Sequence, residues 1–165
     1  MAYSRNVEKR GVAEAAVDYM ADEGPALEDQ HEFLSLLGLR SFDTVSLLKR
    51  LDEGLSYAAF ERLKRHLDVT SRELADAALI NPRTLARRKN AGRFGPGESD
   101  RLVRLARVFS RAIQMYGGNQ GSAREWMMRP NRALGRVSPF EMAKTEVGAN
   151  EVENLITRIE YGVFS

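Results

Sequence analysis

Apolar residues recur every three or four positions along almost the whole chain, the spacing that places them on one face of an α-helix. No stretch combines sustained alternation of apolar and polar residues with the β-branched residues that are typical of a strand. The chain has 165 residues, which is enough for one compact domain or two small ones. We therefore expect an all-α fold.

The sequence offers little for catalysis. It contains no cysteine, which excludes a disulfide framework, a zinc–thiolate site and a thiol nucleophile. The two histidines, His31 and His66, lie outside any metal-binding spacing, and Gly95-Pro96-Gly97 lacks the glycine spacing and the lysine of a phosphate-binding loop. We predict that the protein is not an enzyme and uses neither a metal nor a cofactor.

Nothing in the sequence indicates secretion or a membrane anchor. The basic residues near the N-terminus are not followed by the apolar segment of a signal peptide. No apolar run is long enough to cross a bilayer as a helix. We therefore expect a cytoplasmic protein with no membrane partner.

Charge is distributed unevenly along the chain, although the net charge is only +2. Residues 1–61 contain 6 basic and 12 acidic side chains, whereas residues 62–93 contain 9 basic and 3 acidic ones. A basic block of this length inside a nearly neutral chain indicates a local site for a polyanion.

Two helix start signals lie inside the basic block. Thr70 is followed three residues later by Glu73, the pattern of a capping box. Asn81-Pro82 combines a side-chain acceptor with a residue that lacks a backbone N–H, as is typical of a helix N-terminus. The resulting helices, over 70–78 and 82–91, are separated by a short break and predict a helix-turn-helix.

The second of these helices has the composition of a DNA-recognition helix. It carries several basic residues and no acidic one, and arginine is the residue that most often reads guanine in the major groove. A solvated basic helix with no partner is the alternative. The candidate DNA-binding residues are Arg83, Thr84, Arg87, Arg88 and Lys89.

Ser99 is expected to cap a long helix that ends at Gly117-Gly118. A row of arginines, Arg104, Arg107 and Arg111, lies opposite its apolar stripe. A solvated face is the favoured interpretation, and phosphate contact or a charged protein interface stay open.

The remaining patterns complete the predicted organisation. Further helices are expected over residues 7–21, 27–37, 42–51 (capped by Ser41), from Ser56 through Leu67, and over 123–128, 139–146 and 151–161. The glycine-rich stretch 117–121 is the best linker. We predict an N-terminal helical segment over 1–53, a helix-turn-helix domain over 54–118 and a small helical domain over 119–165.

The last third of the chain contains a set of segments whose order and spacing are distinctive: Trp126, Pro130–Gly135, Ser138–Glu141, Thr145–Ala149 and Arg158–Ser165. In these segments the chain resembles the toxin-binding domain of Xre/MbcA/ParS-type antitoxins, the partners of RES-domain toxins. Residues 54–118 resemble the family's Xre-type helix-turn-helix domain, so the resemblance covers about residues 36–165. Arg136 departs from the family pattern, which more often has a small residue at that turn.

The resemblance implies an antitoxin that blocks the cleft of an NAD-consuming RES-domain toxin and represses its own operon through the helix-turn-helix. A cleft for a phosphate-rich substrate should be basic, so a carboxylate and an aromatic ring suit a blocking segment. The alternative is a stand-alone transcriptional regulator whose C-terminal module dimerises or senses a ligand. The candidate toxin-binding residues are Asn131, Arg158, Glu160, Tyr161, Gly162 and Phe164.

Two local alternatives accompany this interpretation. Trp126 is expected to be a core anchor, and Tyr161 and Phe164 would pack on it if the terminus folds back on its own domain. Operator binding usually needs a dimer, because one helix-turn-helix reads one half-site. An apolar cluster around a glycine is expected to contribute to such a homodimer: Leu36, Leu37, Leu39 and Phe42.

Overall fold

The computed structural model describes residues 32–40 and 43–162, and the predicted helix over 7–21 lies outside this part of the chain. Within the described ranges the secondary structure is helical apart from two isolated β-bridges, which confirms the all-α prediction. The described residues belong to one compact unit. None of their helices is long and apolar enough to cross a membrane.

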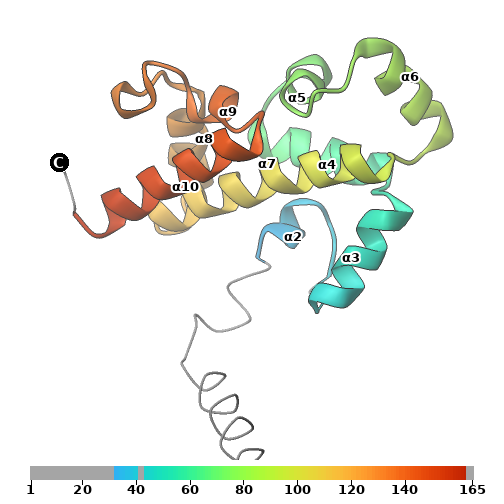
Figure 1. Ribbon diagram of the computed structural model, residues 1–165, viewed down its shortest axis with the longest axis horizontal. Helices are drawn as coiled ribbons and strands as arrows, with labels where there is room; N and C mark the ends of the chain where they lie inside the picture. Colours follow the sequence, from blue (N-terminus) through green and yellow to red (C-terminus); the bar gives the residue numbers. More distant parts are fainter. Residues whose placement is uncertain (1–31, 41–42, 163–165) are drawn as a thin grey trace, which may run out of the picture. The chain divides into compact units, whose positions relative to one another are not determined.

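The helices are labelled as in Figure 1. In chain order they are α2 (Phe33–Leu36), α3 (Thr44–Glu53), α4 (Tyr57–Leu67), α5 (Ser71–Ala77), α6 (Pro82–Ala91), α7 (Pro96–Met115), α8 (Gln120–Met128), the 3-10 helix η2 (Arg132–Leu134), α9 (Pro139–Met142) and α10 (Glu146–Glu160).

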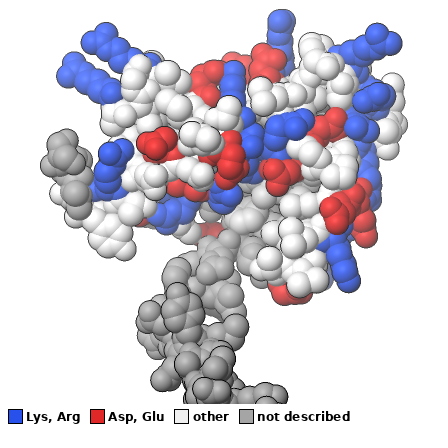
Figure 2. All heavy atoms as spheres, viewed as in Figure 1, with Lys and Arg blue, Asp and Glu red and all other residues white. Residues whose placement is uncertain are grey.

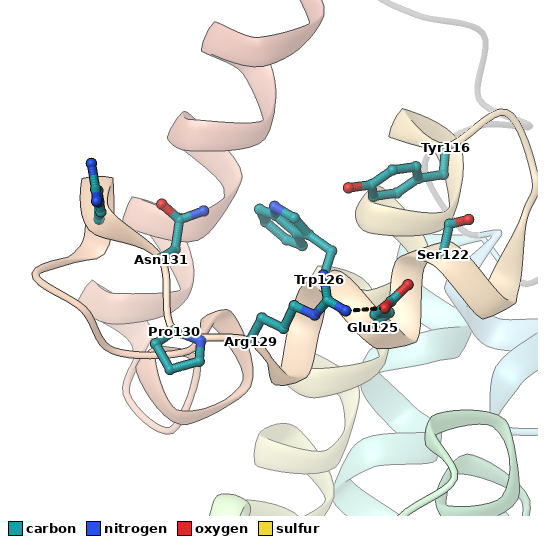
Figure 3. A pocket seen from close by; sticks show the side chains of 8 residues that line it. Tyr116, Ser122, Glu125, Trp126, Arg129, Pro130 and Asn131 are labelled. Carbon is teal, nitrogen blue, oxygen red and sulfur yellow. Dashed lines mark hydrogen bonds and ion pairs between the residues drawn. The ribbon is translucent and has the colours of Figure 1, made fainter.

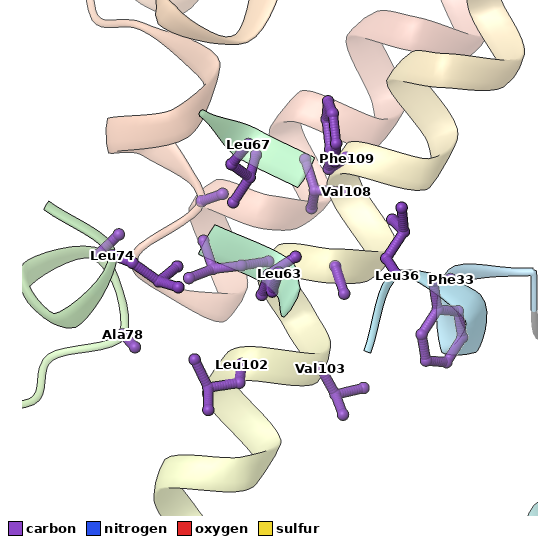
Figure 4. Packing of buried hydrophobic residues seen from close by; sticks show 14 of the residues in the cluster. Phe33, Leu36, Leu63, Leu67, Leu74, Ala78, Leu102, Val103, Val108 and Phe109 are labelled. Atoms are coloured by element: carbon purple, nitrogen blue, oxygen red, sulfur yellow. The ribbon is translucent and has the colours of Figure 1, made fainter. Parts of the chain in front are cut away.

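The long helix α7 is the centre of the fold. Helices α2, α3, α4, α8 and α10 all contact it, and α10 lies alongside it (Figure 1). Its apolar stripe, which includes Leu102, Leu105 and Phe109, is completely buried. Leu63 and Leu67 of α4 belong to the same core cluster (Figure 4). Three helices that precede α7 (α2, α3 and α4) and two that follow it (α8 and α10) all pack on it. Helix α7 therefore links the part of the chain with the helix-turn-helix to the C-terminal helices.

The start of α7 differs from the prediction. Gly95 is its N-cap and Pro96 its first residue, while Glu98 completes a capping box by accepting from the Gly95 amide at 2.7 Å. Ser99 is instead buried inside the helix, where its hydroxyl donates to the carbonyl of Gly95 and accepts from the amide of Leu55 at 2.8 Å. Ser99 therefore joins α7 to the start of α4 rather than capping a helix.

The first described helices also differ from expectation. Asp43 caps α3 by accepting from the amides of Val45 and Ser46, whereas the expected cap, Ser41, lies outside the described residues. Leu36 and Leu37 are buried in the intramolecular core, because α2 packs on α7. The prediction that these two side chains form a dimer surface is wrong. Leu39 is partly buried against the same core, and Phe42 is outside the described residues.

The C-terminal helices begin and end at other residues than predicted. The helix expected over 139–146 stops at Met142, and α10 begins at Glu146 rather than 151, because the Thr145 side chain accepts from the Gly148 amide. Gly148 lies directly against the Met142 carbonyl oxygen, which a Cβ at this position would approach to 1.9 Å. Only glycine allows α10 to begin so close to the end of α9.

Candidate functional site

Helices α5 and α6 form the predicted helix-turn-helix. Thr70 and Glu73 make the capping box of α5, and Asn81 caps α6 by accepting from the Thr84 amide at 2.8 Å. Leu79, in the turn between them, has a left-handed φ of 54°. These contacts confirm both start signals read from the sequence.

Helix α6 presents most of its basic residues to solvent. None of its residues is buried, and Leu85 is the partly buried side chain that contacts the core. Arg83, Arg87 and Lys89 are exposed, and Thr84 is partly buried. Figure 2 shows Lys and Arg side chains projecting from the side of the molecule where α6 lies. This arrangement leaves α6 free to enter a groove of DNA.

Arg88 differs from its basic neighbours because it is bound within the protein. Its Nε and Nη2 donate to the two carboxylate oxygens of Glu98, at 2.7 and 3.2 Å. Partial burial raises the pKa of Glu98, but hydrogen bonds from the Gly95 amide and from Arg88, with the charges of Arg88 and Arg101, outweigh it and lower the pKa. Arg88 thus ties α6 to the start of α7.

The arginine row of α7 is not a solvated face, so the favoured interpretation of the sequence was wrong. Arg104 is 8% exposed and donates to the backbone carbonyls of Ala143 and Lys144, at 3.2 and 2.6 Å. Arg107 pairs with Glu146 at 3.0 Å, and other pairs continue along the helix. The row is a charged interface inside the chain, which α10 covers.

The acidic partners on α10 follow a seven-residue repeat. Glu146, Glu153 and Glu160 lie on one face of the helix because seven residues are close to two turns. Arg107 donates to Glu153 at 2.8 Å and Arg111 to Glu160 at 3.0 Å. Residue numbers rise together in these pairs, so α7 and α10 run parallel. The hydrogen bond from Arg107 is the strongest influence on Glu146 and lowers its pKa against partial burial.

The end of α10 carries several of the candidate toxin-binding residues. Tyr161 is 78% exposed, Arg158 is exposed, and Gly162 has a left-handed φ of 65°. The exposure of Tyr161 excludes the alternative that it packs on Trp126 within the described structure. Glu160 is not free, since it accepts from Arg111. Phe164 lies outside the described residues.

A surface cavity of about 500 Å³ lies between the end of α7, helix α8 and the turn that follows α8 (Figure 3). Tyr116, just after the end of α7, and Trp126, on α8, both line it, and Trp126 is only partly buried. Asn131, which lies 27 to 33 residues before the other toxin-binding candidates, lines the cavity too. Its Oδ1 accepts from the Ala133 amide at 2.9 Å, so Asn131 caps the 3-10 helix η2.

Sequence reasoning missed this cavity. Trp126 was expected to be a core anchor, and it does pack against the core, but it also lines the cavity together with Tyr116. The only local signal was an isolated tryptophan next to a Pro-Asn turn. Among the described residues, no group of three His, Cys, Asp or Glu side chains is placed to hold a metal ion.

Comparison with known proteins decides the family. Residues 46–107 match the model of the antitoxin Xre-like helix-turn-helix domain, and residues 111–162 match that of the antitoxin Xre/MbcA/ParS C-terminal toxin-binding domain. The Antitoxin Xre of Yersinia enterocolitica is 37% identical over 130 residues, which cover 78% of this chain and 88% of that protein. The chain belongs to the Xre/MbcA/ParS-type antitoxins.

Another relative agrees with this assignment. The Antitoxin Xre of Photorhabdus laumondii is 37% identical over 116 residues, which cover 70% of this chain and 78% of that protein. Membership in this regulatory family confirms that the antitoxin is not an enzyme. Helix α7 begins within the first matched domain and ends within the second, so the arginine row joins the two domains of the antitoxin.

Proposed function

We propose that this antitoxin neutralises an NAD-consuming RES-domain toxin and represses its own operon through the helix-turn-helix. The observation that carries the proposal is the end of α10, where Tyr161 is 78% exposed and Arg158 is also exposed. Tyrosine and arginine are the residue types most often found at interface hot spots. An operon repressor acts where the chromosome is, so we place its action in the cytoplasm.

The neutralising segment runs from Arg158 through Gly162 and continues to Phe164. Arg111 contacts one carboxylate oxygen of Glu160, Oε2, and a carboxylate can accept several hydrogen bonds. Oε1 of Glu160 therefore stays available for an arginine in the toxin's cleft, a charge-assisted contact. The left-handed φ of Gly162 turns the chain away from the helix axis. Asn131 contributes from a separate place, the wall of the cavity.

The repressing surface is α6. Arg83 and Arg87 are exposed and suited to bidentate contacts with guanine, and Thr84 and Lys89 lie on the same helix. Arg88 already pairs with Glu98, so we assign it to holding α6 in place rather than to base reading.

Operator binding by this protein would use a homodimer, because a single helix-turn-helix reads one half-site. With Leu36 and Leu37 buried, we assign the contact between two copies to α3. Val45 and Leu48 are 62% and 57% exposed and lie three residues apart on this helix, so they form a small apolar patch on one of its faces. A second copy that covers both would bury them.

Binding of the toxin tests the proposal. The product of the neighbouring gene, the expected toxin, is co-expressed with the antitoxin. The affinity of the toxin is then measured for the unaltered antitoxin, for Tyr161→Ala and for Val147→Ala. Val147 is a matched control, because it is 77% exposed on the same helix but at the opposite end. Tyr161→Ala should weaken binding at least tenfold and Val147→Ala should not. Equal affinities would remove the end of α10 from the interface, and no binding at all would favour a stand-alone regulator.

A further inference from the structure

The cavity beside Trp126 combines aromatic walls with a basic rim. Tyr116 follows α7 and is 39% exposed, and Trp126 projects from α8 toward the same hollow (Figure 3). Arg129 and Arg132 lie at its edge, and both are exposed. Solvent-exposed aromatic rings next to arginines are typical of protein-binding surfaces. The rings provide a large contact area, and ordering them costs little conformational entropy.

The turn that closes the cavity is preorganised. The Asn131 amide donates to the Val137 carbonyl at 3.0 Å, and the Asn131 carbonyl accepts from the Arg136 amide at 2.8 Å. Together with the cap from Asn131 Oδ1 to Ala133, these bonds fix the backbone on both sides of Arg132. This side of the cavity is therefore already ordered before a partner binds, which lowers the entropic cost of binding.

The charges at the rim favour an acidic occupant. Arg129 is paired with Glu125 on the preceding turn of α8, so these two charges offset each other. Arg132 makes no ion pair within residues 32–40 and 43–162. Figure 2 shows basic side chains projecting near the turn after α8. The net positive charge at the mouth attracts a carboxylate.

The position of the cavity distinguishes a protein partner from DNA. Helix α7 has 20 residues and is therefore about 30 Å long. Arg88 ties α6 to the first turn of α7, whereas Tyr116 lines the cavity just after the last turn. Because Arg111 pairs with Glu160, the exposed end of α10 lies at the same end of α7 as the cavity. The cavity therefore lies at the same end of α7 as the proposed toxin-blocking segment and far from α6.

We propose that this cavity seats an acidic segment on the toxin's surface, outside the catalytic cleft. An apolar or aromatic side chain of that segment enters between Tyr116 and Trp126, and an adjacent carboxylate pairs with Arg132. The inference rests on the proposed function, since it assumes a toxin partner. It adds a second anchor, so that the end of α10 blocks the cleft and the cavity contributes further affinity.

Charge reversal tests the second anchor. Arg132→Glu is compared with Arg136→Glu, a matched control on the same turn that is exposed and does not line the cavity. Arg132→Glu should weaken toxin binding at least tenfold, and Arg136→Glu by less than twofold. A photo-crosslinking residue in place of Tyr116 should label a toxin segment rich in Asp or Glu. Reversing one of those acids to Arg should restore binding to Arg132→Glu.

The outcomes separate the inference from the proposed function. If the unaltered antitoxin binds the toxin and both Arg132→Glu and Tyr116→Ala bind it equally well, the second anchor is wrong while the proposed function stands. Equal losses for Arg132→Glu and Arg136→Glu would also contradict it, since they would indicate general charge attraction. Weaker operator binding with unchanged toxin binding would assign the cavity to DNA and overturn the inference. If the unaltered antitoxin does not bind the toxin, both the proposed function and the second anchor are wrong.

Discussion

Nη2 of Arg111 on α7 donates to Oε2 of Glu160 on α10 at 3.0 Å, one residue before the exposed Tyr161. This pair is the last in a row that begins at Arg104 and connects the two halves of the antitoxin. It fixes the direction in which the chain leaves α10. The helix that completes the DNA-binding domain therefore also positions the segment that we propose meets the toxin.

The buried member of this row should contribute most to stability. Replacing Arg104 by Ala leaves the carbonyls of Ala143 and Lys144 without their donor, so we expect a loss of about 3 kcal/mol in the free energy of unfolding. Urea denaturation measures it. Arg136→Ala, an exposed control, should change stability by less than about 0.5 kcal/mol. Equal stabilities for both variants would show that the Arg104 bonds are not needed to hold α9 and α10 on α7.

The pair of Arg88 and Glu98 should make stability depend on pH. A carboxyl whose pKa is lowered by folding stabilises the protein above its unfolded pKa, about 4.3, and loses that contribution as the pH falls through the folded value. Glu98→Gln should therefore be less stable than the unaltered protein at pH 7. The difference should shrink as the pH drops below about 4. A difference that stays constant down to pH 3 would contradict this account of Glu98.

Exposed and internally paired arginines on α6 should behave differently in DNA binding. Arg83→Ala or Arg87→Ala should cost about 1–3 kcal/mol in operator affinity if each reads a base. Arg88→Ala should act through α6 itself, lowering thermal stability as well as affinity. Gel shifts on the antitoxin's own promoter, together with melting curves, make the comparison. An unchanged gel shift for the Arg83/Arg87 double alanine would remove α6 as the DNA reader.

The apolar face of α3 predicts how the antitoxin associates with itself. Placing Asp at both Val45 and Leu48 should convert a dimer to a monomer, because an unpaired carboxylate in an apolar contact is costly. Neither side chain is buried in the protomer, so the helix content should not change. Light scattering at micromolar concentration gives the mass. A monomeric mass for the unaltered protein would refute the α3 dimer directly.

Local signals in the sequence predicted the local structure well. Thr70, Asn81 and Asn131 each cap the backbone a few residues away, so a short window of sequence contains both partners. The role of the arginine row depends largely on α10, whose glutamates follow their arginine partners by 39 to 49 positions. Nothing in the spacing of Arg104, Arg107 and Arg111 reveals that a helix will cover them.

The same limit explains the errors at Ser99 and Leu36. Gly95 and Ser99 lie within five residues, and either can precede the helix. The buried amide of Leu55, 44 positions before Ser99, decides which role Ser99 takes. The sequence around Leu36 does not reveal that α2 packs on α7, so Leu36 was interpreted as part of an exposed apolar surface although it is buried. The cavity at Trp126 was missed for a related reason, because its walls come from two helices and a turn.

The rate at which the purified toxin consumes NAD tests the central claim most directly. It is measured with the unaltered antitoxin and with a variant that lacks residues 161–165 but keeps Glu160 and its bond to Arg111. The unaltered antitoxin should stop NAD consumption at equimolar concentration. The shortened variant should still bind operator DNA and keep its helix content while the toxin stays active. Full inhibition by the shortened variant would contradict the claim that the end of α10 blocks the cleft.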